Sequence, residues 1–197
     1  NLVADLAGSA KGRVKFGLVP FSHHVYLTLP KNMVAGQSGT GTWTGCTQDR
    51  PYPANVSEAT PLPGDPKTKW GHAHWADHIT WDCSKYAPNK LVVMPLTDKY
   101  GDVTKRLNEM IPYSWTHIAL GVEFGWHLLS PDAPFQEGAS YADSETQKFM
   151  VVLTDGEQTE GAFGPGGSRT VADGEDNLEK LCENAKSAGI TMLTISF

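Results

Sequence analysis

The sequence lacks several features that mark common functional classes. It has no run of basic residues, and its 16 Lys and Arg against 22 Asp and Glu give a formal net charge of −6. A surface that follows nucleic-acid phosphates is therefore disfavoured. No stretch approaches the roughly 20 apolar residues of a membrane-spanning helix. The chain opens at NLVADLAGSA, without an initiating Met or a basic start, which indicates an internal piece of a longer protein.

Common catalytic and redox signatures are also missing. The chain contains no Gly-x-Ser-x-Gly elbow and no Gly-x-Gly-x-x-Gly after an apolar run, so neither a serine hydrolase nor a dinucleotide-binding protein is indicated. Its three cysteines, Cys46, Cys83 and Cys182, form no Cys-x-x-Cys pair. Cys46 and Cys83 lie at the two ends of one irregular segment, where they can form a disulfide or remain buried thiols.

Apolar residues recur with alternating strand and helix periods. Strands are predicted at RVKFGLVPF and HHVYLTL, joined by a tight connection, and at KLVVMPLT, KFMVVLT and ITMLTISF. Helices are predicted at residues 98–111, within WTHIALGVEFGWHLLSP, and around Leu178, Leu181, Cys182 and Ala185. Strands alternating with helices favour an α/β fold with a doubly wound, mostly parallel sheet, formed by residues 1–197 as one domain.

Residues 30–90 form a long irregular insertion in this pattern. The segment is rich in Gly, Pro, Ser and Thr and contains four of the chain's six tryptophans. An excursion of this length is usually functional or stabilised by its own cross-link. Its WGHAHWADH stretch places His72, His74 and His78 close together, as zinc ligands do. The same histidines and tryptophans could instead form a surface that contacts sugars or proteins.

The apolar run KFMVVLT stops at Asp155-Gly156. Ligands of doubly wound sheets bind beyond the carboxyl ends of the strands, and Mg²⁺ prefers oxygen ligands, so Asp155 is a candidate metal ligand. Asp-Gly is also a common turn dipeptide. Thr116, just before the second predicted helix, is either the N-cap of that helix or a second oxygen ligand facing the same crevice.

Six segments occur in order along nearly the whole chain: RVKFGLVPFS, GCTQDRPYP, VVMPLTDKYGDVTKRLNEM, SWTHIALGVEFGWHLLSPDAPF, VVLTDGEQTE and LCENAKSAGITMLTISF. Together they resemble the von Willebrand factor A (vWA) domain of TadG-like proteins of bacterial tight adherence (Tad) pilus assembly. In vWA domains, three loops form an adhesion site for a divalent cation. Thr116 and Asp155 match the second and third loops.

The first loop, Asp-x-Ser-x-Ser, has no match in the chain. DLAGSA, from Asp5, has Ala7 in place of the first Ser, and too few residues separate it from the strand near Arg13 for the crossover helix. DSET, from Asp143, lacks the spacing. We therefore interpret residues 1–10 as the tail of that helix, with the first strand and its loop upstream. The missing strand would leave an exposed strand edge through which copies of the chain could associate.

The resemblance implies a non-enzymatic, extracytoplasmic adhesion or assembly module. It would bind a protein partner, such as a pilus or envelope component, through Mg²⁺ or another divalent cation held weakly by Thr116 and Asp155. An oxidising compartment also favours a Cys46–Cys83 disulfide. The alternatives are a zinc enzyme or a carbohydrate-binding surface built on the histidine- and tryptophan-rich insertion, and a purely structural vWA domain without a metal site.

Overall fold

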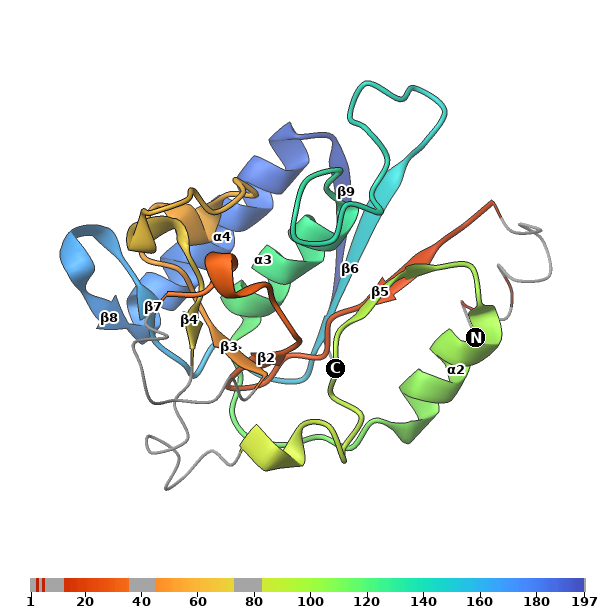
Figure 1. Cartoon of the computed structure of the whole chain (residues 1–197). Helices are drawn as coiled ribbons and strands as arrows, with labels where there is room; N and C mark the ends of the chain where they lie inside the picture. The colour runs from red at the N-terminus through yellow and green to blue at the C-terminus, as the bar shows by residue number, and fades with distance from the viewer. Residues whose placement is uncertain (1–2, 4, 6–12, 36–44, 73–82, 197) are drawn as a thin grey trace.

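Helices and short strands alternate along the chain, which confirms the mixed α/β class (Figure 1). The structure is a computed structural model and describes residues 3, 5, 13–35, 45–72 and 83–196. Its strands are β1 (Phe16–Leu18), β2 (Val25–Tyr26), β3 (Cys46–Gln48), β4 (Gly71–His72), β5 (Met94–Thr97), β6 (Lys148–Thr154), β7 (Ala162–Phe163), β8 (Arg169–Thr170) and β9 (Ile190–Ser196). Its α-helices are α2 (Tyr100–Glu109), α3 (Ile118–Leu129) and α4 (Val171–Ser187).

The described strands form separate small sheets and not the single doubly wound sheet that the sequence predicts. The sheets are β1–β5, β2–β3–β4, β6–β9 and β7–β8. Of these, β6–β9 is parallel, with Lys148 opposite Ile190 and Thr154 opposite Ser196. The two strands predicted with a tight connection occur as β1 and β2, and an isolated antiparallel bridge joins Phe21 to Val25 between them. Beyond this bridge, β1 pairs with β5, and β2 pairs with β3 from the insertion. The main partner of each strand therefore comes from a distant segment, and the partner of β2 comes from the insertion.

Helix α3 is the centre of the molecule. Nearly all of it is buried, as expected of a helix that is apolar on every side. Side chains of Leu120, Phe124 and Leu128 pack with β2 and the insertion, whereas other side chains of α3 pack with β6, β9 and α4. Gly121 and Gly125 permit this packing, since a Cβ on Gly121 would lie 2.6 Å from Phe21 and one on Gly125 would lie 3.2 Å from Met150.

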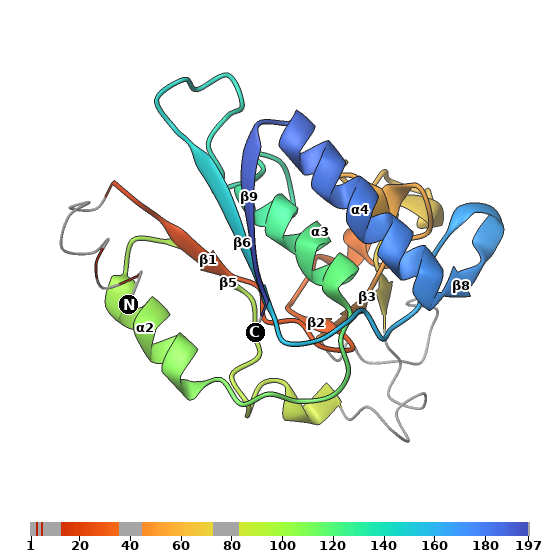
Figure 2. The same cartoon turned by 180° about the vertical axis from the view of Figure 1, so that it is seen from behind.

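Helices α2 and α3 lie on opposite sides of the strands. Gly17 of β1 faces α3, because a Cβ there would lie 2.8 Å from Leu128. Its neighbour Phe16 points the other way and contacts Tyr100 of α2, with the ring centroids 5.9 Å apart. In both views α3 and α4 lie together beside β6 and β9, whereas α2 lies beside β1 and β5 (Figure 1, Figure 2).

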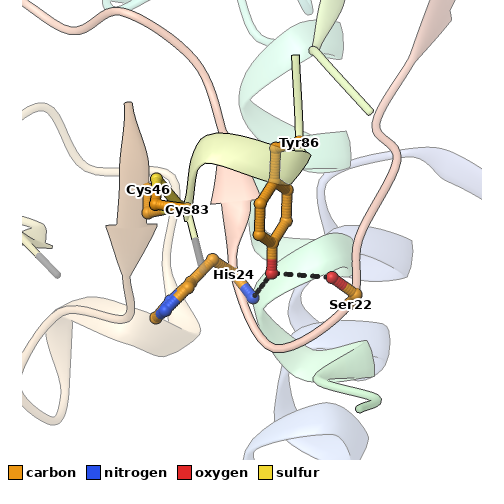
Figure 3. Close-up of a disulfide and its surroundings, with 5 residues drawn as sticks. All are labelled: Ser22, His24, Cys46, Cys83 and Tyr86. Carbon is orange, nitrogen blue, oxygen red and sulfur yellow. Dashed lines mark hydrogen bonds between the residues drawn. A yellow bond between two sulfur atoms is a disulfide. The ribbon is translucent and has the colours of Figure 1, made fainter. Parts of the chain in front are cut away.

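The predicted disulfide joins Cys46 to Cys83 and closes the insertion onto the domain (Figure 3). Both half-cystines are buried against Tyr86. The Tyr86 hydroxyl accepts hydrogen bonds from Ser22 Oγ (2.8 Å) and from the backbone N–H of His24 (3.1 Å) (Figure 3). The cross-link therefore adjoins a network that fixes the chain between β1 and β2.

A second attachment of the insertion is a buried polar cluster of Arg50, Trp70, Glu123 and His127. Arg50 Nε lies 2.6 Å from Glu123 Oε1, and Trp70 Nε1 donates to the same oxygen at 2.9 Å. Arg50 also donates to the carbonyls of Ser57 and Ala59. Because these groups lie on α3 and on the insertion, Arg50 and Trp70 of the insertion are part of the core.

The N-terminal segment is helical where the structure describes it. Of residues 1–10, expected to be the tail of a helix, the structure describes Val3 and Asp5, and both are helical. Within the described ranges, no helix is both long enough and apolar enough to cross a membrane.

Candidate functional site

The two predicted metal ligands lie on loops that are hydrogen-bonded to each other. The Thr116 carbonyl accepts from the backbone N–H groups of Thr159 (2.9 Å) and Glu160 (3.1 Å). In return, the Thr116 N–H donates to Thr159 Oγ1 at 2.9 Å. These bonds tie the segment before α3 to the loop that follows β6. The structure therefore brings together two positions that are about 40 residues apart in the sequence.

Asp155 lies in a bend that other groups hold in place. Thr154 Oγ1 accepts from the Gly156 N–H (3.2 Å) and donates to the Gly156 carbonyl (3.0 Å), so the threonine stabilises the bend. A Cβ on Gly156 would lie 3.9 Å from Thr116 Oγ1, which shows how close the two loops approach. Within the described part of the chain, neither the exposed Asp155 carboxylate nor the Thr116 hydroxyl has a hydrogen-bond partner. Both oxygens are thus available to a ligand.

Thr116 is not the N-cap of α3. His117 has that role, and its Nδ1 accepts from the Leu120 N–H at 3.2 Å. Gln158 adds a second cap: its Oε1 accepts from the N–H groups of Ile118 (2.7 Å) and Ala119 (3.2 Å). These acceptors satisfy N–H groups that a helix start leaves without intrahelical partners. The Thr116 side chain is therefore not needed for capping.

The loop after β1 reaches the same end of the molecule. Ser22 accepts a hydrogen bond from the His117 N–H through its carbonyl (2.8 Å). The next residue, His23, places Nδ1 2.7 Å from Glu160 Oε1. Three loops, following β1, preceding α3 and following β6, thus meet around Thr116 and Asp155. We call Thr116, Asp155, Thr159, Glu160 and His23 the strand-end cluster.

The buried carboxylate of Asp49 stabilises the segments next to the strand-end cluster. Burial opposes ionisation of Asp49, but the neighbouring His117 and Arg169 outweigh it and hold the pKa of Asp49 at about 2. Arg169 Nη1 lies 2.6 Å from Asp49 Oδ1, and the Phe163 N–H donates to Oδ2 at 2.7 Å. Asp49 therefore remains ionised and links the insertion to the start of α3 and to β7–β8.

The strand-end cluster offers oxygen ligands of the kind that Mg²⁺ uses, but few of them. Among the described residues, no three His, Cys, Asp or Glu side chains are grouped as a metal site. One hydroxyl and one carboxylate supply only part of a six-oxygen shell. A cation held here would therefore take most of its ligands from water or from a partner.

The predicted histidine site lies mostly beyond what the structure describes. His72 is in β4, whereas His74 and His78 lie outside the described residues. Trp70, at the start of the same stretch, is fully buried and stacks on Phe124, with the ring centroids 5.2 Å apart. Trp70 is therefore a core residue and not part of a binding surface.

Sequence reasoning missed the residues that support the strand-end cluster. Gln158 and Asp49 are buried, yet both are ordinary polar residues in the sequence. The only indication of Gln158 in the sequence is its position three residues after Asp155, on a loop that was already a candidate site. Asp49 has no such signal, because its partners are more than 60 residues away.

Comparisons with models of protein families, with curated proteins and with solved structures find no match for the chain.

Proposed function

We propose that the chain is a vWA-type, non-enzymatic adhesion or assembly module that binds a protein partner at the strand-end cluster. A divalent cation such as Mg²⁺ would bridge the two proteins, with Thr116 as a direct ligand and Asp155 holding the ion through water. An acidic side chain of the partner would complete the oxygen shell. The proposed setting is extracytoplasmic, in an envelope or pilus assembly of the Tad type.

The single observation that carries the proposal is the close approach of Thr116 to the Asp155-Gly156 bend, where a Cβ on Gly156 would lie 3.9 Å from Thr116 Oγ1. The backbone hydrogen bonds between Thr116 and the loop after β6 leave both side-chain oxygens without a partner among the described residues. Capping of α3 by His117 and Gln158 removes the structural reason for a threonine at this position. A hydroxyl without a partner, close to a bend whose carboxylate also has none among the described residues, supplies two oxygen atoms for a cation site.

The arrangement of the strands gives secondary support. Helix α3 contacts both β1, through Leu128 against Gly17, and β6, through Gly125 against Met150. In the described part of the chain, β1 and β6 are not hydrogen-bonded to each other. A doubly wound sheet that lacks a strand between β1 and β6 would look like this, which is what the vWA resemblance implies.

The Cys46–Cys83 disulfide supports the proposed compartment. Disulfides persist in secreted, periplasmic and surface proteins and are rare in reducing cytoplasm. This cross-link includes Cys46, which lies three residues before Asp49, the buried carboxylate next to the strand-end cluster.

Paramagnetic NMR tests the cation site directly. Mn²⁺ added to ¹⁵N-labelled protein broadens amide signals near the place where it binds. We expect selective loss of the signals of Thr116, Gly156 and Thr159 at Mn²⁺ concentrations that leave most of the spectrum intact. Excess Mg²⁺ should restore them, because the two ions share oxygen ligands.

Two variants make the test specific. Asp155→Asn and Thr116→Val should each weaken the broadening at least tenfold. Asp143→Asn is the matched control, because Asp143 is an exposed carboxylate in the loop before β6. Broadening centred on Asp143, or unaffected by Asp155→Asn, would overturn the proposed site.

A further inference from the structure

One face of the β6–β9 sheet carries an unusual row of exposed apolar side chains. Alternate residues of each strand point to opposite faces, and residues paired across the two strands share a face. Met150 and Val152 pack against α3 and α4, so their neighbours face away from these helices. On that far face, exposed fractions run from 37% to 53% for Phe149, Val151, Leu153, Leu193 and Ile195. We call these five residues the apolar face.

The apolar face lies in a layer that is only partly filled. Met150 and Gly17 both point toward α3, so the apolar face is on the same side of the strands as Phe16, which contacts α2. Helix α2 lies beside β1 and β5 and not beside β6 and β9 (Figure 1, Figure 2). Parallel strands are normally covered on both faces, and helices are their usual cover. We therefore expect a helix as the cover of this face of β6–β9.

The length of the face sets the length of its cover. Strands β6 and β9 have seven residues each, so the face is about 23 Å long. A helix of about 15 residues has this length. Five side chains of this size, about half exposed, present on the order of 400 Å² of apolar surface, which is within the range of the largest patch of a typical monomer, a patch that is often functional.

The acidic residues at the ends of β6 favour a basic partner. Exposed acidic residues lie at both ends of β6, namely Asp143 and Glu145 before it and Asp155 and Glu157 after it. One exposed lysine, Lys186, precedes β9. Two copies packed face to face would bury about 800 Å² through these side chains, less than the roughly 1,200 Å² of a stable interface. They would also bring chains of net charge −6 together. A second copy is therefore the weaker occupant.

We propose that the apolar face is a docking site for an amphipathic helix of a partner protein, with an apolar stripe about four turns long and Lys or Arg along its margins. The apolar stripe would cover Phe149, Val151 and Leu193, and the basic margins would meet the acidic loops at the two ends of β6. This mode of recognition uses apolar anchors at helical spacing. It shares Asp155 with the cation site proposed above, but its apolar anchors lie outside the strand-end cluster.

A designed peptide tests this docking site. The probe is a fluorescent peptide of about 15 residues made of Leu and Lys, with Leu at helical spacing. We expect saturable binding to the whole chain by fluorescence anisotropy, weaker at high salt because exposed charges are screened. A scrambled peptide of the same composition, and one with Glu in place of Lys, should each bind at least tenfold more weakly.

Variants of adjacent residues on one strand locate the binding surface. Leu193→Lys places a charge on the apolar face and should weaken binding at least tenfold. Thr194→Lys is the matched control, because Thr194 is exposed, lies on the same strand and points to the opposite face. It should change the dissociation constant less than twofold. Phe149→Lys provides a second variant on the apolar face, should Leu193→Lys fail to fold by circular dichroism.

Three results would overturn the docking site. They are no saturable binding of the designed peptide, equal binding by the protein and its Leu193→Lys variant, and a stable dimer in sedimentation that Leu193→Lys dissociates. The last result would make a second copy the occupant. Mn²⁺ broadening at Thr116 should persist in Leu193→Lys, so failure here is distinguishable from failure of the cation site.

Discussion

Two polar groupings, one that includes residues within helix α3 and one next to the N-terminal end of that helix, differ in how their charges are used. In the buried cluster, Arg50 and Glu123 are almost fully buried; Arg50 has several partners, and Glu123 accepts from Arg50 and Trp70 through Oε1, whereas its buried Oε2 has no hydrogen-bond partner among the described residues. In the strand-end cluster, Asp155 is exposed and has no hydrogen-bond or ion-pair partner among the described residues. Buried charges require such partners because desolvation is costly. The buried cluster is thus a structural device, whereas the strand-end cluster has groups left over for a ligand.

In the buried cluster, burial also determines the protonation of the side chains. Burial raises the pKa of Glu123 to about 7, although Arg50 opposes the shift. Burial, together with the adjacent Arg50, lowers the pKa of His127 well below its usual value, so this histidine is neutral. Its neutral ring can accept from Arg50 Nη2, which lies 3.1 Å from Nε2. Burial therefore favours the uncharged form of both Glu123 and His127.

The largest effect should come from breaking the buried cluster. Arg50→Met leaves Glu123 without its cation and leaves the carbonyls of Ser57 and Ala59 without a donor. We expect a loss of about 3–5 kcal/mol in the free energy of unfolding, measured by urea denaturation. Lys105→Met removes only an exposed ion pair and should cost less than about 0.5 kcal/mol. A loss below about 1 kcal/mol in Arg50→Met would refute the structural role of the cluster.

Removal of the disulfide should have the next largest effect. Replacing Cys46 and Cys83 by Ser releases a loop whose ends are 37 residues apart, which costs about 3–4 kcal/mol in the chain-entropy model. The urea midpoint of the double variant reports this loss. Cys182→Ser serves as the control, since Cys182 is a free thiol on α4 and its replacement leaves the loop closed. Equal midpoints for the double variant and the unmodified protein would argue against a cross-linking role.

Acid should weaken the support beneath the strand-end cluster. The pKa of Asp49 is about 2 in the folded chain against an ordinary 3.8, so the folded state releases this proton more readily than the unfolded state. The stabilisation is therefore complete above pH about 4 and is lost as the pH falls from about 4 toward 2. It amounts to about 2 kcal/mol. Unfolding measured across this range should show a smaller acid loss in Asp49→Asn, and identical slopes would contradict the assignment.

The smallest effect on stability is expected at Asp155. Asp155→Asn removes an exposed, unpaired charge, so the free energy of unfolding should change by less than about 0.5 kcal/mol. Mn²⁺ broadening at Thr116 should nevertheless be lost in this variant. A large loss of stability together with unchanged broadening would mean that Asp155 is a structural residue and not a cation ligand.

Much of the secondary structure could be predicted from sequence. The helical spacing of Leu181 and Ala185 and the unbroken apolar run of β6 agree with α4 and β6 as they occur. The prediction for residues 98–111 was less successful: Val103 is buried in α2, but Leu107 is 38% exposed and Ile111 lies beyond the helix, 56% exposed. Periodicity indicates which face is apolar, but not whether another element covers it.

The arrangement of strands could not be predicted in the same way. Local pattern predicted β1 and β2 with a tight connection between them, but it did not indicate that β2 pairs with β3, whose Cys46 is held by the disulfide. Strand pairing depends on contacts between distant residues, and a single sequence does not display them.

The candidate site shows the same division. Sequence by itself determined that Asp155 ends an apolar strand and that Thr116 precedes a helix, because hydrophobic period and turn chemistry are local properties. Only the tertiary structure decided that His117 and Gln158 cap that helix, that Thr116 lies beside Gly156, and that five apolar side chains of β6–β9 remain exposed. Burial and hydrogen-bond partnership arise when distant segments meet, and that meeting decides which polar groups stabilise the fold and which remain available to bind.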